Sequence, residues 1–189
     1  MKRRMVLVPH CDKQEIIVGR NVSPKLEPWL LGDPPLSERG ISDAHALVDS
    51  VCHLGPFNFI YCSRLQRAAQ MAAVAALRLE VDFASLAGLG QHGSKNGSTV
   101  TMLPGHETEN IGDWQRAGME AIHVIAQRMF RPIEIILVMT HRPVLAGIAE
   151  FILGNTDPDT VNAAVGKWSA KPYVIVEIDD DDKITLVDE

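Results

Sequence analysis

The sequence predicts an α/β fold, a three-layer α/β/α arrangement with a mainly parallel central sheet. Short apolar runs of the kind found in strands buried on both faces recur along the chain, and segments with helical spacing of apolar residues separate them. A chain that alternates strand and helix in this way forms a mainly parallel sheet with helices on both faces. The length of 189 residues suits a single domain, residues 1–189.

The first strand and helix are separated by a long excursion. Met5–Val8 is a continuous apolar run and is the first predicted strand. Residues 13–36 are rich in proline and glycine, and loops of that length in a compact domain are usually functional or mobile. Ser37 is a plausible N-cap for a helix that reaches about His53.

The next strand–helix unit is shorter. Residues 57–62 (FNFIYC) form the second predicted strand. Ser63 is a plausible cap for an alanine-rich helix over residues 64–79. Residues 84–106, rich in glycine and serine, are expected to be irregular.

The second half of the chain predicts two helices and three strands. A helix is expected over residues 110–128, and residues 133–140 (IEIILVMT) are the clearest buried strand. Pro143 suits the first turn of a helix that reaches Leu153. Residues 173–187 (YVIVEIDDDDKITLV) are expected to form two strands joined by an acidic turn, which is more typical of a solvated hairpin tip than of a metal site.

Composition excludes several classes of protein. The net charge of -6 and the pI near 5.6 argue against a nucleic-acid-binding protein. Three cysteines without close spacing favour reduced thiols. Because the apolar run near the N-terminus is too short for a secretory signal and no stretch approaches a membrane span, we expect a cytoplasmic protein.

Polar side chains follow three of the predicted strands. His10 follows the first strand, Arg64 and Arg67 follow the second, and His141 follows the strand at residues 133–140. In an open α/β sheet, ligands bind beyond the carboxyl ends of the strands, where helix N-termini also attract anions. Two histidines and several arginines at one edge of the sheet therefore predict a phosphate site.

The chemistry of such a site follows from the residue types. A neutral imidazole is a nucleophile toward phosphorus and yields a phosphohistidine. Arginine holds the phosphoryl oxygens through its planar fork of donors, and a second, protonated histidine can donate to them. This reaction requires neither a metal nor a cofactor.

Four segments, in order, resemble those of a known family, the histidine phosphatase superfamily with its phosphoglycerate mutase-like fold. They are PHCD at 9–12, PLSERG at 35–40, CSRLQRA at 62–68 and VMTHRPVL at 138–145. The resemblance spans about residues 5–178. The His-x-Pro form of the last segment and the compact C-terminal strands look more like the short phosphohistidine phosphatase branch than like the mutases.

The resemblance implies roles for several residues. His10 would be the phosphorylated nucleophile, and Arg67 and His141 would complete the phosphate pocket. Arg20 lies on the loop where relatives often place a basic residue that contacts substrate. Many relatives place a glutamate general acid after the second helix, where this chain has His92 instead, and the phosphohistidine phosphatases manage without that glutamate.

Two residues depart from the family pattern. Pro9 stands where the family has arginine, and Cys11 stands where it has glycine. Loss of one preorganised donor costs about a hundred- to a thousandfold in rate. Lys13 and Arg64 are candidates to replace the lost charge, while Arg142 beside His141 is expected to point away.

These observations leave two functions of different classes open. One is a metal-independent phosphatase that acts through phospho-His10 on a phosphorylated small molecule or a phosphohistidine protein. The alternative is a catalytically inactive relative that binds a phosphorylated ligand or a protein partner. A mutase, and a phosphatase that uses Cys11 as its nucleophile, are weaker hypotheses because the insertions and the glycine-rich loop that they need are not evident.

Overall fold

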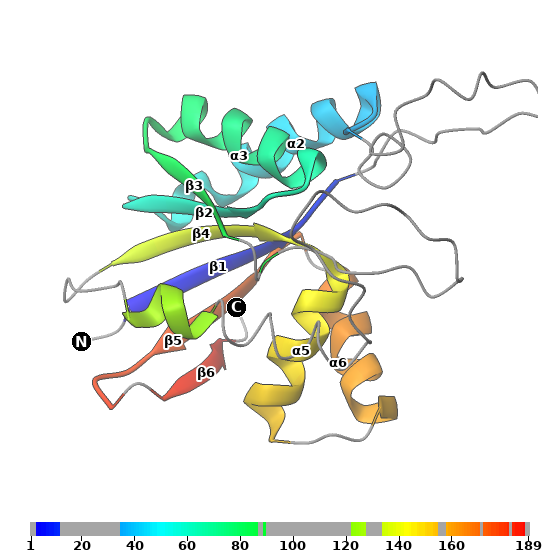
Figure 1. Ribbon diagram of the computed structural model, residues 1–189, viewed down its shortest axis with the longest axis vertical. Coiled ribbons are helices and arrows are strands. Elements are labelled where there is room, and N and C mark those ends of the chain that lie inside the picture. The colour runs from blue at the N-terminus through cyan, green and yellow to red at the C-terminus, as the bar shows by residue number, and fades with distance from the viewer. Residues whose placement is uncertain are drawn as a thin grey trace, which may run out of the picture.

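A six-stranded sheet with helices on both faces forms the centre of the molecule (Figure 1). The structure is a computed structural model, and it describes residues 3–11, 35–86, 89, 122–127, 134–154, 158–170, 172–181 and 183–187. The predicted α/β class with three layers is confirmed. Among the described residues, no helix combines the length and the apolar character needed to cross a membrane.

The sheet has the strand order β3-β2-β4-β1-β5-β6. Neighbours from β3 to β1 run parallel, and the last two strands are antiparallel to their neighbours. The sheet is therefore mainly parallel, as predicted, and the C-terminal pair forms the expected hairpin. The strands are β1 (Arg3–Pro9), β2 (Phe59–Ser63), β3 (Phe83–Leu86), β4 (Ile135–Thr140), β5 (Val174–Ile178) and β6 (Ile184–Val187).

Helices cover the two faces of the sheet in pairs. In Figure 1, α2 and α3 lie above the sheet, and α5 and α6 lie below it. A short helical stretch at residues 122–127 also packs on the lower face. The elements are α2 (Glu38–Val51), the 3₁₀ turn η1 (Cys52–Leu54), α3 (Gln66–Leu79), α5 (Arg142–Leu153) and α6 (Pro158–Ala170).

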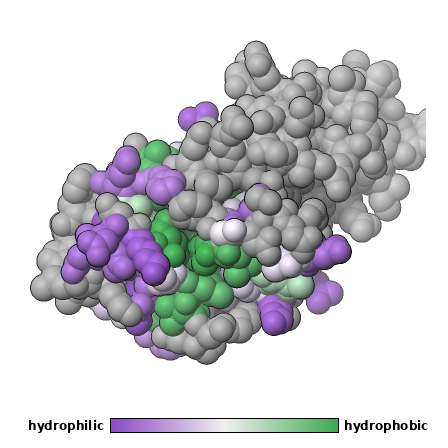
Figure 2. All heavy atoms as spheres, turned by 90° about the horizontal axis from the view of Figure 1, so that it is seen from below, coloured by the Kyte–Doolittle hydropathy of each residue, from purple (hydrophilic) through white to green (hydrophobic). Residues whose placement is uncertain are grey.

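An apolar core lies on each face of the sheet, between the sheet and the helices that cover it. Successive side chains of β1 point alternately into one core and the other. Met5 and Leu7 pack into the core on the α5 and α6 side, whereas Val6 and Val8 pack into the core under α2 and α3. A continuous apolar strand is thus buried on both faces, as expected for the centre of a sheet. Seen from the side of α5 and α6, apolar side chains gather at the centre of the described surface, bordered by hydrophilic ones (Figure 2).

Some of the helix caps, strands and helices predicted from the sequence are present in the structure, and others are not. Ser37 is the N-cap of α2, because its side chain accepts a hydrogen bond from the N–H of Gly40 at 2.9 Å. The prediction that Ser63 caps α3 is wrong: the helix begins at Gln66, and its N-cap residue is Leu65. The expected irregular region at 84–106 begins with an unpredicted strand, β3, and α6 was not predicted either. Of the helix predicted over residues 110–128, the described part, 122–127, is helical.

Pro9 occupies a strand position that needs no N–H donor. The N–H groups of Arg4 and His10 donate to carbonyls of Glu134 and Thr140 on the β4 side. Successive residues of a strand direct their N–H groups to opposite neighbours, so the nitrogen of Pro9 points toward the β5 side. The pairing of β1 with β5 ends where Leu7 lies opposite Val174. The proline therefore lies beyond the end of β5 and removes no hydrogen bond from the ladder.

Arg4 and Glu177 form an ion pair across β1 and β5 at directly paired positions. Glu177 Oε1 lies 3.0 Å from Arg4 Nε and 2.9 Å from Arg4 Nη2, and the Glu177 side chain is only 8% exposed. Replacement of Glu177 by glutamine is expected to lower the free energy of unfolding by about 2 kcal/mol, because it removes a buried carboxylate charge that lies directly against the guanidinium of Arg4. Urea denaturation monitored by circular dichroism measures this change.

An exposed ion pair provides the matched control. Arg78 Nε and Asp49 Oδ1 also lie 2.9 Å apart, but their side chains are 65% and 57% exposed. Asp49→Asn should therefore change the stability by less than about 1 kcal/mol. Equal effects of the two substitutions would show that burial does not strengthen the pair between Arg4 and Glu177.

Candidate active site

Three strands end at the same level of the sheet and bring the predicted site residues together. Pro9 pairs with Thr140, so His10 and His141 each follow directly on neighbouring parallel strands. Cys62 pairs with Met139, which places Ser63 one residue further, level with the end of β4. Side chains from β1, β4 and β2 therefore meet beyond the carboxyl edge of the sheet, where ligands bind in α/β folds.

The imidazole of His10 is held by the main chain of the next residue. His10 Nδ1 lies 2.7 Å from the carbonyl oxygen of Cys11. A carbonyl oxygen can only accept, so Nδ1 carries the proton. In the neutral ring the lone pair then lies on Nε2, which is the nitrogen suited to attack phosphorus.

His141 lies beside His10 and is fully buried. Their ring centroids are 5.0 Å apart with an interplanar angle of 60°. His141 Nε2 lies 2.8 Å from Ser63 Oγ, and Ser63 is also 0% exposed. Because Nε2 is hydrogen-bonded to Ser63, the other ring nitrogen, Nδ1, is the one suited to contact a ligand bound between the two histidines.

Arg67 and two helix N-termini add positive potential to the same edge. Arg67 lies in the first turn of α3 and is only 3% exposed. Helix α5 begins at Arg142, directly after His141, whose carbonyl accepts the first bonds of that helix. The N–H groups and dipoles at these N-termini favour an anion, and a buried guanidinium is the side chain best suited to a phosphoryl group.

Hydrogen bonds brace the two strand ends that hold the histidines. The N–H of His10 donates to the carbonyl of Thr140 at 2.9 Å, and Thr140 Oγ1 donates to the carbonyl of Leu89 at 3.1 Å. The N–H of Cys11 lies 3.1 Å from Met71 Sδ, and Cys11 packs against the core under α2 and α3. The main chain at His10 and Cys11 is thereby held on both sides.

The remaining predicted site residues are either exposed or outside the described part of the chain. Arg64 is exposed, just before α3. Lys13, Arg20 and His92 lie outside the described residues, as does the side chain of Arg142. The geometry therefore brings His10, Arg67 and His141 to one edge of the sheet. That Lys13 or Arg64 replaces the charge lost at Pro9 stays a prediction.

Ser63 is the site residue whose role the sequence did not reveal. The serine was expected to cap the following helix, and its Oγ does accept the N–H of Leu65 at 3.1 Å. Its second contact is with His141, 78 residues away in the chain. The only signal for this contact was its position directly after a strand, level with two histidines.

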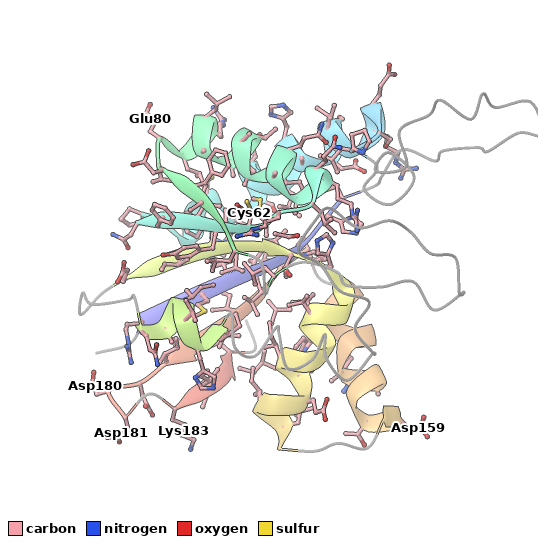
Figure 3. The ribbon with its side chains drawn as sticks, viewed as in Figure 1. Cys62, Glu80, Asp159, Asp180, Asp181 and Lys183 are labelled. Carbon is pink, nitrogen blue, oxygen red and sulfur yellow. The ribbon has the colours of Figure 1, made fainter. Side chains whose placement is uncertain are left out.

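The acidic turn between β5 and β6 has a structural role. Asp179 Oδ1 accepts the N–H groups of Asp181 and Lys183 at 3.0 and 2.9 Å, and the side chains of Asp180, Asp181 and Lys183 point outward (Figure 3). Within the residues that the structure describes, no cluster of three or more histidine, cysteine, aspartate or glutamate side chains could hold a metal ion.

The three cysteines are thiols and differ in burial. Cys62 is 0% exposed, between the sheet and helices α2 and α3 (Figure 3), and burial raises the pKa of its thiol from 9.0 to about 11. Since the thiolate is the reactive form, Cys62 should react with iodoacetamide at pH 8 at least about a hundredfold more slowly than exposed Cys52. Both cysteines lie on the tryptic peptide of residues 40–64, so fragmentation of this peptide by tandem mass spectrometry at timed intervals measures the two rates separately.

Unfolded protein is the control for this labelling, and the two cysteines should then react at similar rates. Equal rates in the native protein would contradict the burial of Cys62.

The raised pKa of the Cys62 thiol makes a second prediction. Because the folded state holds the proton longer, stability should decrease as the pH rises from about 9 to about 11.

Comparison with known families decides the classification. The family model described as "Histidine phosphatase superfamily (branch 1)" matches residues 29–183, which is most of the chain. The chain belongs to the histidine phosphatase superfamily. The matched residues include Arg67 and His141 and begin after His10.

Solved structures share this fold across nearly the whole chain. YhfR of Bacillus stearothermophilus has a TM-score of 0.70 at 20% identity, covering 99% of this chain and 96% of that one. SixA of Agrobacterium tumefaciens, provisionally assigned as a phosphohistidine phosphatase, has a TM-score of 0.60 at 15% identity, with coverage of 98% and 96%. Phosphoglycerate mutase of Plasmodium falciparum has a TM-score of 0.59 at 12% identity, with coverage of 100% and 90%. No curated protein matches this sequence.

Proposed function

We propose that the protein is a metal-independent phosphatase that forms a phosphohistidine at His10. The observation that carries the proposal is the hydrogen bond from His10 Nδ1 to the carbonyl of Cys11, which leaves the Nε2 lone pair for attack. The ring centroids of His10 and His141 lie 5.0 Å apart. His141 would therefore contact the phosphoryl group that His10 attacks. Membership of the superfamily supports the same class of reaction.

The reaction has two balanced steps. Nε2 of His10 attacks phosphorus, the bond from phosphorus to the leaving group breaks, and the leaving group departs with the bonding electrons and takes up a proton from solvent. Water then attacks the phosphohistidine and releases a proton to solvent, the P–N bond breaks with its electron pair returning to Nε2, and inorganic phosphate is released. Arg67 and His141 would hold the phosphoryl oxygens in both steps, where their positive charge and N–H donors stabilise the developing negative charge.

The proposed substrate is a phosphorylated small molecule or a phosphohistidine protein. The likeness to SixA supports the second, because a phosphohistidine leaving group is itself a nitrogen base and needs no separate acid. Lys13, Arg20, Arg64 and His92 remain the proposed contacts for the rest of such a substrate. We place the protein in the cytoplasm, which its reduced cysteines support, and propose no partnership with nucleic acid or membrane.

Rapid mixing with para-nitrophenyl phosphate tests the proposal. A burst of nitrophenol and an alkali-stable, acid-labile phosphoenzyme are expected, and EDTA should leave the rate unchanged. A phosphohistidine peptide tests the second substrate class in the same way. Turnover that EDTA abolishes would contradict the proposed mechanism.

Pro9 favours a second candidate, a non-catalytic protein that binds a phosphorylated ligand. Proline offers no donor at the position where the resemblance places an arginine. Under this alternative, calorimetry should detect binding of inorganic phosphate, but no labelled phosphoenzyme should form with either substrate. The burst experiment separates the two functions directly.

A further inference from the structure

The hydroxyl of Ser63 lies between a main-chain donor and the imidazole of His141. Its Oγ accepts the N–H of Leu65 at 3.1 Å and lies 2.8 Å from His141 Nε2. Ser63 and His141 are each 0% exposed, so water does not compete for this contact. Ser63 is the last residue of β2, next to the end of β4, and its position is therefore set by the sheet.

The hydroxyl can match both ionisation states of His141. A serine hydroxyl has one donor and two acceptor sites, and the N–H of Leu65 uses one acceptor site. With neutral His141, the Oγ–H can donate to Nε2, so the ring proton lies on Nδ1. With protonated His141, Nε2–H donates to the remaining lone pair of Oγ, and Nδ1 again carries a proton.

We propose that Ser63 is a positioning residue that keeps an N–H on Nδ1 of His141 whether that imidazole is neutral or charged. The inference rests on the proposed phosphatase function, in which Nδ1 is the nitrogen that meets a phosphoryl oxygen. Without the hydroxyl, neutral His141 can carry its proton on Nε2 and turn a lone pair toward that oxygen. Activity would then depend on the charged form alone.

Other ionisable groups at this edge have different roles. His10 faces His141 from β1, and its Nδ1 proton is committed to the carbonyl of Cys11. Arg67 on α3 keeps its charge throughout the usable pH range. Cys62 on β2 stays protonated to about pH 11. A change in the alkaline behaviour that appears only when Ser63 is altered is therefore assigned to His141.

Kinetics over pH 5 to 10 provide the first test, with para-nitrophenyl phosphate as substrate. Ser63→Ala should lower kcat/KM by about tenfold at pH values above the alkaline limb of the wild-type pH profile, and by less at acid pH. The alkaline limb itself should move to lower pH. Ser63→Thr, which retains the hydroxyl, should restore the wild-type limb, and Ser50→Ala, an exposed serine on α2, should leave it in place.

Nitrogen NMR of the histidine side chains tests the inference without reference to activity. In the unmodified protein at alkaline pH, the His141 signal, assigned by its loss in His141→Gln, should show a proton on Nδ1 and none on Nε2. In Ser63→Ala the proton should move wholly or partly to Nε2. A proton on Nε2 in the unmodified protein would overturn the role of Ser63 even if phosphatase activity is found.

The two measurements keep the failures apart. An inactive protein with the expected tautomer of His141 would refute the phosphatase function and retain the contact with Ser63. An active protein whose pH profile is the same with serine and alanine at position 63 would refute the positioning role alone.

Discussion

Replacement of His10 by alanine is expected to lower turnover of para-nitrophenyl phosphate by about 10⁴-fold or more, because no other described side chain presents a lone pair in the same position. The loss should be in kcat, and no phosphoenzyme should be trapped. Binding of inorganic phosphate, measured by calorimetry, should persist because Arg67 and His141 remain.

The control must separate chemistry from folding. His45→Ala changes an exposed histidine on α2 and should leave both turnover and phosphate binding unchanged. His10 is half-buried, so the thermal unfolding of His10→Ala should also be compared with that of the wild type. If His10→Ala retains more than a tenth of the wild-type rate in a folded protein, His10 is not the nucleophile.

The meeting of His10 and His141 could be predicted because strand position carries much of the information. Each residue directly follows an apolar run long enough to be a buried strand. The carboxyl ends of parallel strands share one edge of a sheet, so both side chains were expected there. The sequence did not indicate that Pro9 and Thr140 are paired, which is what brings the two ring centroids to 5.0 Å.

Other features depended on contacts between distant parts of the chain. The sequence suggested a helix cap at Ser63, which the structure does not show, and only the fold reveals that its hydroxyl meets His141. Strand β3 has four residues with alternating exposure, and its pairing with β2 defines it more than any local pattern does. The ion pair between Arg4 and Glu177 likewise requires the antiparallel register of β1 and β5.

Replacement of Pro9 by arginine is expected to raise kcat/KM for para-nitrophenyl phosphate by about a hundredfold, the value of one preorganised donor to developing charge. The backbone accommodates this change, because Pro9 lies beyond the paired end of β5 and its replacement removes no hydrogen bond from the ladder. The resemblance to the family places an arginine at this position, one residue before His10, the proposed nucleophile.

Two further substitutions at position 9 separate the contribution of the guanidinium from the effect of removing proline. Pro9→Gln supplies a polar side chain without charge and should give little gain, and Pro9→Lys should give an intermediate gain because a point charge lacks the two-pronged geometry. If all three variants match the wild type, the missing arginine does not limit the reaction. If the arginine variant alone gains activity and loses it again with His10→Ala, the chain has a functional nucleophile and lacks one donor to the phosphoryl group.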